Sequence, residues 1–225
     1  YKVRKDVFEQ LEQLLSENNG QSLNGSLSSL FAGLQDVATN PTGLPERATL
    51  VAEAQILSSV FNNLGESLFQ IQQNLDSSIS VEVAKINSLA QGIGELNKSI
   101  HANESTTYNA NDLRDKRDQK VKELSEIIDI NITPEQDGQI SLTLDDGTPL
   151  VLFSNVFTVT TTPNGNNKSF LDVEFLDGAD KTKNVTSSIT GGTIKGFLEM
   201  RDVEVEGLKD KLDRLAAGFI QEFNE

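Results

Sequence analysis

The chain has 225 residues, of which 36% are hydrophobic, and it carries a formal net charge of −15. This acidity argues against binding to nucleic acids or anionic membranes, because their phosphate groups would be repelled. Without cysteine, and with His101 as the single histidine, the chain cannot form disulfides, thiolate sites or a histidine-rich metal site. The low hydrophobic content favours an elongated, helix-rich body. The sequence shows neither an apolar run long enough to span a membrane nor the pattern of a cleavable signal peptide.

The N-terminal part of the chain predicts two helices. An apolar stripe from Val3 to Leu14 has the spacing of a first helix, and the glycine- and asparagine-rich sequence NNGQSLNGS ends it. Ser26 is expected to cap a second helix, whose apolar positions lie between Leu27 and Val37. Asn40-Pro41 is expected to end this helix, because a residue before proline disfavours helical backbone.

The longest helical pattern runs from about Pro45 to about Ile100, with apolar residues at alternating steps of four and three. At about 1.5 Å per residue this helix would be roughly 80 Å long, a length typical of coiled-coil rods. Successive steps of four near Ile79 interrupt the heptad in the manner of a stutter. Three internal glycines weaken the helix only locally.

The stretch ANDLRDKRDQKVKELSEII, from Ala110 to Ile128, predicts a helix that runs antiparallel to the long one after the polar connection HANESTTYNAN. Asn111 or Asp112 is expected to cap this helix at its N-terminus. Arg117 falls on the apolar seam, from which it could reach a carboxylate on another helix.

After Asp129 the apolar period changes from that of a helix to that of a strand. The segments IDINIT, QISLTL, PLVLF, VFTVTTT and FLDVEFL predict strands. Turn chemistry between and after them comes from four pairs, Asp137-Gly138, Asp146-Gly147, Asn164-Gly165 and Asp177-Gly178. Gly191-Gly192 is expected to be a hinge, after which a last helix carries apolar residues from Ile194 to Phe223.

These elements predict an α+β fold. Residues 1–128 and 192–225 are expected to form an elongated antiparallel helical bundle with long, coiled-coil-like helices. Residues 129–191 are expected to form a small antiparallel β subdomain inserted between the helices.

The candidate sites have simpler structural explanations. Asp112, Asp115 and Asp118 recur every three residues, but this spacing turns them slowly around a helix, and a catalytic pair needs partners from elsewhere in a cleft. The Asp-Gly and Asn-Gly pairs do not match a calcium loop, and Gly191-Gly192 lacks the residues of a phosphate loop. His101 begins a polar loop without an evident partner. We therefore expect no catalytic, cofactor-binding or metal-binding residues and no enzymatic activity; an enzyme that uses the aspartates and a coiled-coil surface adhesin are the alternatives.

Three stretches of the chain closely resemble the flagellar hook-associated protein 1 family, in order and over nearly the whole length. They are SLSSLFAGLQDVATNPTGLPERATLVAEAQILSSVFNNL, NDLRDKRDQKVKELSEIIDINITPEQDGQISLTLDDGTPLV and the segment that begins ITGGTIKGFLEMRD. The most specific motifs are LQDVATNP with Arg47 following, and NDL-x-D-x-RD at Asn111 to Asp118. Arg114 stands where the family more often has Leu, and Met200 where Phe is usual.

The resemblance implies a structural protein of the bacterial flagellum that joins hook and filament, assembles as a ring, and is secreted through the flagellar type III apparatus. The implied partners are copies of itself, the hook protein, the second hook–filament junction protein and an export chaperone. The terminal helices of the family, and the C-terminal region that binds the chaperone, are expected to be absent from this chain. Another flagellin-like filament protein is the alternative within this class.

Overall fold

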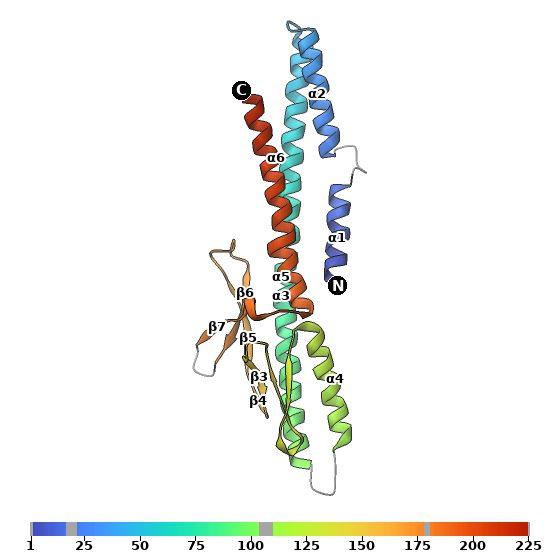
Figure 1. The fold of residues 1–225 in the computed structure, drawn as a ribbon. Helices are drawn as coiled ribbons and strands as arrows, with labels where there is room; N and C mark the ends of the chain where they lie inside the picture. Colours follow the sequence, from blue (N-terminus) through green and yellow to red (C-terminus); the bar gives the residue numbers. More distant parts are fainter. Residues whose placement is uncertain (1, 17–21, 104–109, 178–180, 225) are drawn as a thin grey trace. The chain divides into compact units, whose positions relative to one another are not determined.

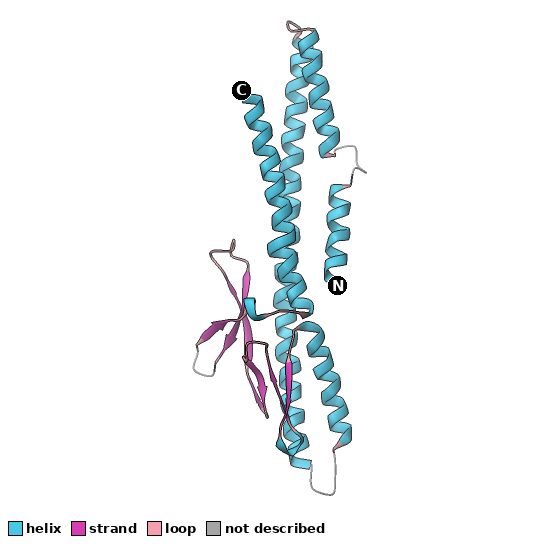
Figure 2. Ribbon diagram, viewed as in Figure 1, coloured by secondary structure: helices cyan, strands magenta, loops and turns pink. Residues whose placement is uncertain are grey.

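The computed structural model of the protein describes residues 2–16, 22–103, 110–177 and 181–224. Within these ranges the chain forms helices α1 to α6, a π-helical segment and two small antiparallel sheets (Figures 1 and 2). The predicted α+β class, with a long helix and small antiparallel sheets, is confirmed.

The contacts within the chain divide it into two compact units. Unit 1 comprises Tyr1–Gln72 with Met200–Glu225, and unit 2 comprises Gln73–Glu199. Helix α3 (Leu44–Asn103) contributes residues to both units. The predicted division into a helical rod and a β subdomain at residues 129–191 stays a prediction.

The regular secondary structure in the described residues of unit 1 is helical. It contains α1 (Lys2–Leu15), α2 (Leu23–Thr39), the first part of α3, the π-helical segment η3 (Met200–Val205) and α6 (Glu206–Asn224). Its buried apolar side chains are Val7, Leu11, Leu30, Leu57, Val60, Leu68, Met200 and Val205. The stripes predicted for the first two helices and for the start of the long helix therefore supply most of this core.

The cap of helix α2 differs from the prediction. The Ser22 hydroxyl, not that of Ser26, accepts a hydrogen bond at 3.0 Å from the Gly25 backbone N–H. Ser26 is buried inside the helix. The expectation was wrong because the Asn-Gly pair next to Ser26 lies in the first turn of the helix, where it does not interrupt it. Most of the glycine- and asparagine-rich sequence before this cap lies outside the described residues.

Helix α3 confirms the longest predicted element to within a few residues at each end. Gly94 lies where the helix approaches the strands closely. A Cβ atom at this position would lie 2.5 Å from a Val156 methyl group and 3.2 Å from the Ser154 carbonyl oxygen. The glycine that appeared to weaken the helix therefore makes room for a strand connection of unit 2.

Helix α4 (Asn111–Ile127) packs its predicted seam inward, with Arg117, Val121 and Leu124 buried. Its cap was predicted incorrectly: Ala110 occupies the N-cap position, and no side chain forms a capping hydrogen bond there. The predicted connection between α3 and α4 lies mostly outside the described residues.

The strands of unit 2 form two antiparallel sheets. The first has the order β1-β2-β3-β4, and its strands are β1 (Asn131–Pro134), β2 (Ile140–Thr143), β3 (Pro149–Leu152) and β4 (Asn155–Val156). The second has the order β5-β6-β7, and its strands are β5 (Thr158–Pro163), β6 (Leu171–Leu176) and β7 (Thr182–Asn184). All five predicted strand segments are found, although VFTVTTT is divided between β4 and β5. Strand β7 was not predicted, because its sequence TKN is short, polar and fully exposed.

The core of unit 2 joins the second part of α3 to α4, both sheets and α5 (Gly192–Glu199). Ile86 and Ile93 of α3, Leu124 of α4 and Ile194 of α5 are completely buried. Gly192 begins α5 with φ +80°, and a Cβ atom there would lie 2.4 Å from the Ile127 carbonyl oxygen. Only glycine fits this hinge, as the Gly-Gly pair had indicated.

Candidate functional site

The charged stretch that opens α4 does not bring its carboxylates together. Asp112, Asp115 and Asp118 are all exposed along one short helix. Among the residues that the structure describes, no group of three or more acidic or histidine side chains could hold a metal ion. Asp118 accepts hydrogen bonds at 3.2 Å from the guanidinium of its neighbour, Arg117.

Arg117 is the buried member of this stretch, with 5% of its surface exposed. Its Nη1 donates to the Gly138 carbonyl oxygen at 2.7 Å and lies 3.4 Å from Asn97 Oδ1. The expectation that Arg117 would reach a carboxylate on another helix was wrong. Its carboxylate partner is Asp118 on the same helix, and the polar group that it meets on α3 is a neutral amide. The guanidinium joins α4, α3 and the turn before β2.

Asn97 is completely buried and binds the first sheet through its main chain. Its Nδ2 donates to the carbonyl oxygens of Ile140, at 2.7 Å, and Phe153, and its Oδ1 accepts from the Ile140 N–H at 3.3 Å. Buried main-chain groups need such partners, because an unpaired one costs about 1–3 kcal/mol. The Asn97 side chain thus forms the main-chain hydrogen bonds that a neighbouring strand would otherwise form.

Asn97 is one of three polar side chains on α3 that bind the main chain of the sheets. Asn87 donates to the Val159 carbonyl at 2.7 Å and accepts from the Val159 N–H at 2.9 Å. Asp76 accepts from the Leu171 N–H at 2.8 Å. The spacings of about three helical turns place all three on one face of α3. We call these residues, Asp76, Asn87 and Asn97, the α3 polar ladder.

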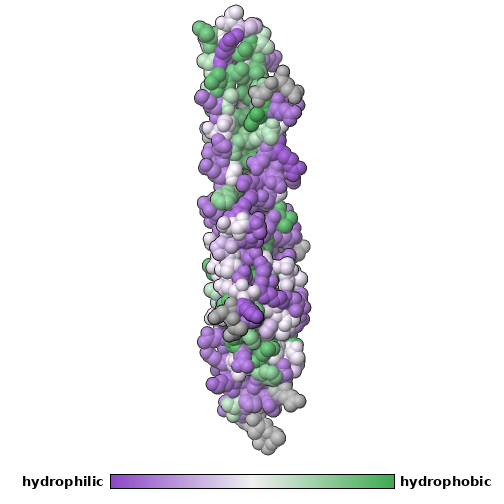
Figure 3. Space-filling view, turned by 90° about the vertical axis from the view of Figure 1, so that its left-hand side faces the viewer, coloured by the Kyte–Doolittle hydropathy of each residue, from purple (hydrophilic) through white to green (hydrophobic). Residues whose placement is uncertain are grey.

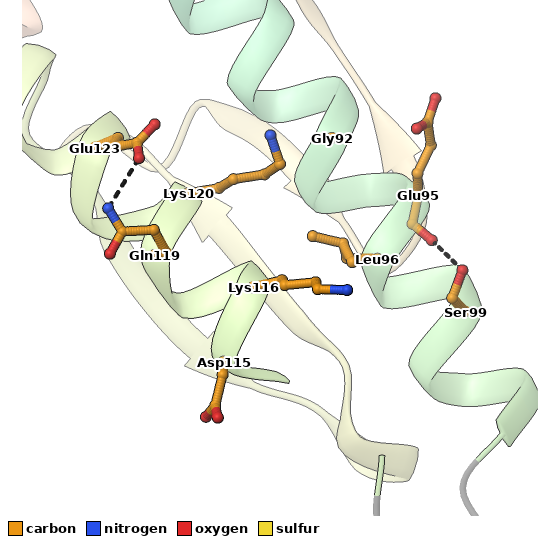
Figure 4. A pocket seen from close by; sticks show the side chains of 9 residues that line it. All are labelled: Gly92, Glu95, Leu96, Ser99, Asp115, Lys116, Gln119, Lys120 and Glu123. Carbon is orange, nitrogen blue, oxygen red and sulfur yellow. Dashed lines mark hydrogen bonds between the residues drawn. The ribbon is translucent and has the colours of Figure 1, made fainter. Parts of the chain in front are cut away.

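An open groove of about 730 Å³ lies between α3 and α4 (Figure 4). Lys116 and Lys120 project from α4 towards α3, whereas Asp115 points away (Figure 4). Gly92 gives Lys120 room, because a Cβ atom there would lie 3.0 Å from Lys120 Cε. The remaining lining residues are Glu95, Leu96, Ser99, Gln119 and Glu123. The lining residues therefore include both lysines and carboxylates.

The turn between α2 and α3 is held by the residues of the LQDVATNP motif and Arg47. The Arg47 guanidinium donates to the Pro41 carbonyl at 2.7 and 3.0 Å. Asn40 Nδ2 donates to Glu46 Oε1 at 3.0 Å. Both motifs that carry the family resemblance thus contain an arginine that binds a main-chain carbonyl, Arg47 here and Arg117 in α4.

A second polar cluster joins the two sheets around Asp146. Its carboxylate accepts hydrogen bonds from Lys183 at 2.7 Å, from Ser188 at 2.9 Å and from the Thr148 N–H at 2.9 Å. Burial acts to raise the pKa of Asp146, but the hydrogen bonds from Lys183, Thr148 and Ser188 outweigh it. The pKa of this carboxyl group is therefore held well below its usual value. Asp146-Gly147 also forms the predicted turn, with Gly147 at φ +80°.

His101, which was expected to begin a polar loop, lies instead in the last turn of α3. The His101 side chain is 55% exposed, and its Nδ1 lies 3.7 Å from Asp137 Oδ2, a contact that the sequence did not indicate. Gly178 of the last Asp-Gly pair lies outside the described residues. In the described part of the chain, no helix has the length and apolar character needed to cross a bilayer.

Unit 1 carries most of the exposed apolar side chains. A groove of about 410 Å³ lies between α2, α3 and α6, and Leu57, Phe61 and Phe219 are among its lining residues. Phe219 makes an edge contact with Phe31 at 6.3 Å between ring centroids. Figure 3 shows hydrophobic surface gathered over the end of unit 1 that carries the α2–α3 turn. The exposed large apolar residues of this unit are Phe8, Leu15, Phe31, Leu44, Val51, Ile56, Val203, Leu215, Ile220 and Phe223.

In the described part of the chain, Asn97, Asn87, Asp76, Arg117 and Arg47 all bind main-chain groups and so hold the elements in place. Asn97, Asn87 and Asp76 all fall within the predicted long helix, but their contacts with the sheets were not predicted. A signal was present, namely short polar side chains at three-turn spacing on a helix that faces strands. The buried role of Arg117 was indicated by its place on the seam of α4.

The comparisons with known proteins agree with this architecture. The family described as the flagellar hook-associated protein FlgK helical domain matches residues 8–225. The chain is 28% identical to flagellar hook-associated protein 1 of Salmonella typhimurium, over 99% of this chain and 40% of that protein. It is also 28% identical to the protein of that name from Bacillus subtilis, over 100% of this chain and 49% of that protein.

The fold resembles that of a solved structure. The flagellar hook junction protein FlgK from Burkholderia pseudomallei matches with a TM-score of 0.81 and 26% identity, over 89% of this chain and 36% of that one. The chain thus spans less than half the length of these relatives.

Proposed function

Since this chain belongs to the family of the flagellar hook-associated protein FlgK helical domain, we propose that it is part of the junction between hook and filament of a bacterial flagellum. The observation that carries this proposal is the match of residues 8–225 to that family. The agreement in fold with a hook junction protein supports it. The polar ladder on α3 and the arginine–carbonyl contacts of Arg47 and Arg117 fix elements to one another, as a structural role requires of any rigid subunit.

The protein works, in this proposal, by assembly. Copies of it form a ring on the hook, and this ring receives the second hook–filament junction protein. The full protein reaches this place through the flagellar type III apparatus, with an export chaperone, and ends in the extracellular flagellum. The resemblance described above supports each of these steps.

Complementation tests the proposed role. In a flagellated bacterium that lacks its own hook-associated protein 1, the full-length protein that contains this chain should restore filaments on hooks and swimming. The same protein without residues 8–225 should restore neither, while still being secreted. Filaments restored equally by both versions would overturn the proposal.

The protein is proposed to act without catalysis. Calorimetric titration of the chain with Mg²⁺, Ca²⁺ or Mn²⁺ should give no saturable heat, because the carboxylates of α4 are separate and exposed. Saturable binding that is lost in the Asp115→Asn variant would instead favour an enzyme that uses the aspartates and a metal ion.

A further inference from the structure

The π-helical segment η3 immediately precedes α6 within unit 1. A π-turn pairs residues that are five apart, so each such turn takes in one residue more than an α-turn. An inserted residue of this kind changes the rotational register of everything that follows it in the helix. Single π-turns inside helices are rare and are frequently found where a protein has a functional need for them.

One buried side chain of α3 bridges the two ends of such a turn. Gln72 is 1% exposed, and its Nε2 donates to the Arg201 carbonyl oxygen at 2.8 Å and to Glu206 Oε2 at 2.9 Å. Residues 201 and 206 are five apart, which is the spacing of the π-turn. Both N–H groups of a single amide are therefore used to hold that spacing.

The Gln72 amide uses its donors but not its acceptor. Its Oε1 is buried and has no hydrogen-bond partner among the described residues. A buried acceptor without a partner costs free energy. The amide is useful here for its two donors.

The alternative register of α6 can be worked out from the sequence. Without the extra residue, each place on α6 would be taken by the preceding residue, after a rotation of about 100°. Val205, Leu208 and Leu212 would be replaced by Glu204, Gly207 and Lys211. The contact of Phe219 with Phe31 would be lost, because Gly218 would take the place of Phe219.

We propose that Gln72 is a register lock for α6, which holds the π-turn of η3 and so decides which side chains of α6 face α3. With the lock closed, Val205 is completely buried and Leu215 lies on the exposed part of α6. Gln72 acts as a positioning residue.

The absence of cysteine from the chain allows a direct test by disulfide formation. Ser58 and Ala216 line the same groove, whereas Leu215, the neighbour of Ala216, does not line it. Two double variants are compared, Ser58→Cys with Ala216→Cys, and Ser58→Cys with Leu215→Cys. Because a disulfide needs Cβ atoms about 4 Å apart, the first pair should oxidise faster in the chain with Gln72.

In the Gln72→Leu background the order of the two oxidation rates should reverse, because Leu215 takes the place of Ala216. Circular dichroism establishes whether the variant is folded. If Gln72 only contributes to stability, both pairs will react in the original order, and that result would overturn the proposal.

A milder variant decides the matter if Gln72→Leu does not fold. Glu206→Ala removes one of the two acceptors and keeps the bond between Gln72 and Arg201. In the Glu206→Ala background, the oxidation rate of the pair at positions 58 and 216 should fall relative to that of the pair at positions 58 and 215. If Glu206→Ala leaves the ratio of the two oxidation rates unchanged, Gln72 does not set the register of α6.

Discussion

Leu124 and Asp115 occupy different environments of the same helix, and they should respond differently to truncation. Leu124 is completely buried, so Leu124→Ala should lower the free energy of unfolding by about 2–5 kcal/mol. Asp115 is exposed, and Asp115→Ala should leave the midpoint of urea unfolding unchanged within error. Ile71 of α3 is only half-buried and is a poorer probe of the core. Equal midpoints for the two variants would mean that the faces of α4 are assigned incorrectly.

The carboxylate of Asp146 should make stability depend on pH in acid. Its pKa is lowered from 3.8 in the folded chain, so the unfolded chain takes up a proton first as the pH falls. The stabilisation is therefore fully present above about pH 4 and is lost progressively at lower pH. Asp146→Asn should be less stable than the native chain at about pH 7, and its unfolding free energy should fall less between about pH 4 and pH 2.

A matched control separates this effect from the general acidity of the chain. Asp115→Asn changes the net charge by the same amount at an exposed position. It should follow the pH profile of the native chain in urea unfolding. If Asp115→Asn flattens the profile as much as Asp146→Asn does, the hydrogen bonds from Lys183 and Ser188 are not the cause.

At the scale of elements, the α3 polar ladder should tie each sheet to α3 separately. Asn97→Leu removes the partners of the Ile140 main chain and should increase amide hydrogen exchange in β2 and β3. Asn87→Leu removes the partners of the Val159 main chain and should act on β5 and β6 instead. Each variant is the control for the other. Identical exchange patterns in the two variants would show that the two sheets open together, and that Asn97 and Asn87 do not act on separate sheets.

The sequence predicted those elements whose apolar pattern is long or alternating. Helix α3 and the seam of α4 were predicted because burial follows the period of an α-helix, as at Ile86 and Leu124. The caps were missed, since Ser22 and Ser26 are equally good capping residues and only the packing of Ser26 distinguishes them. Strand β7 was missed because pairing with β6, not apolar character, makes it a strand.

The last helical pattern shows a limit of periodicity. Apolar residues from Ile194 to Phe223 predicted one helix, but the structure has α5, η3 and α6 there. A π-turn adds one residue to the helix. The apolar residues are spaced three or four apart, and this spacing continues across the added residue without a visible break. The side chain that binds this turn is Gln72, a residue distant in the sequence that no local pattern connects to Arg201.

At the scale of the whole molecule, charge and exposed apolar surface oppose each other. The net charge of −15 repels copies of the chain from one another, whereas residues such as Phe31 and Ile220 of unit 1 favour association. Repulsion between exposed charges is screened beyond about 10 Å at 0.1 M salt and beyond about 3 Å at 1 M. Residues 1–225 should therefore sediment as a monomer at micromolar concentration in 0.1 M salt, and should associate reversibly as the salt is raised to about 1 M.

Variants of unit 1 identify the surface responsible. Phe31→Ser and Ile220→Ser each remove an exposed apolar side chain and should reduce association at high salt. Val81→Ser, an equally exposed change on the part of α3 in unit 2, should leave it unaltered. Sedimentation velocity over a series of concentrations distinguishes these cases. A ring that forms in 0.1 M salt, independent of concentration, would mean that the chain contains a complete assembly interface, strong enough to overcome its own charge.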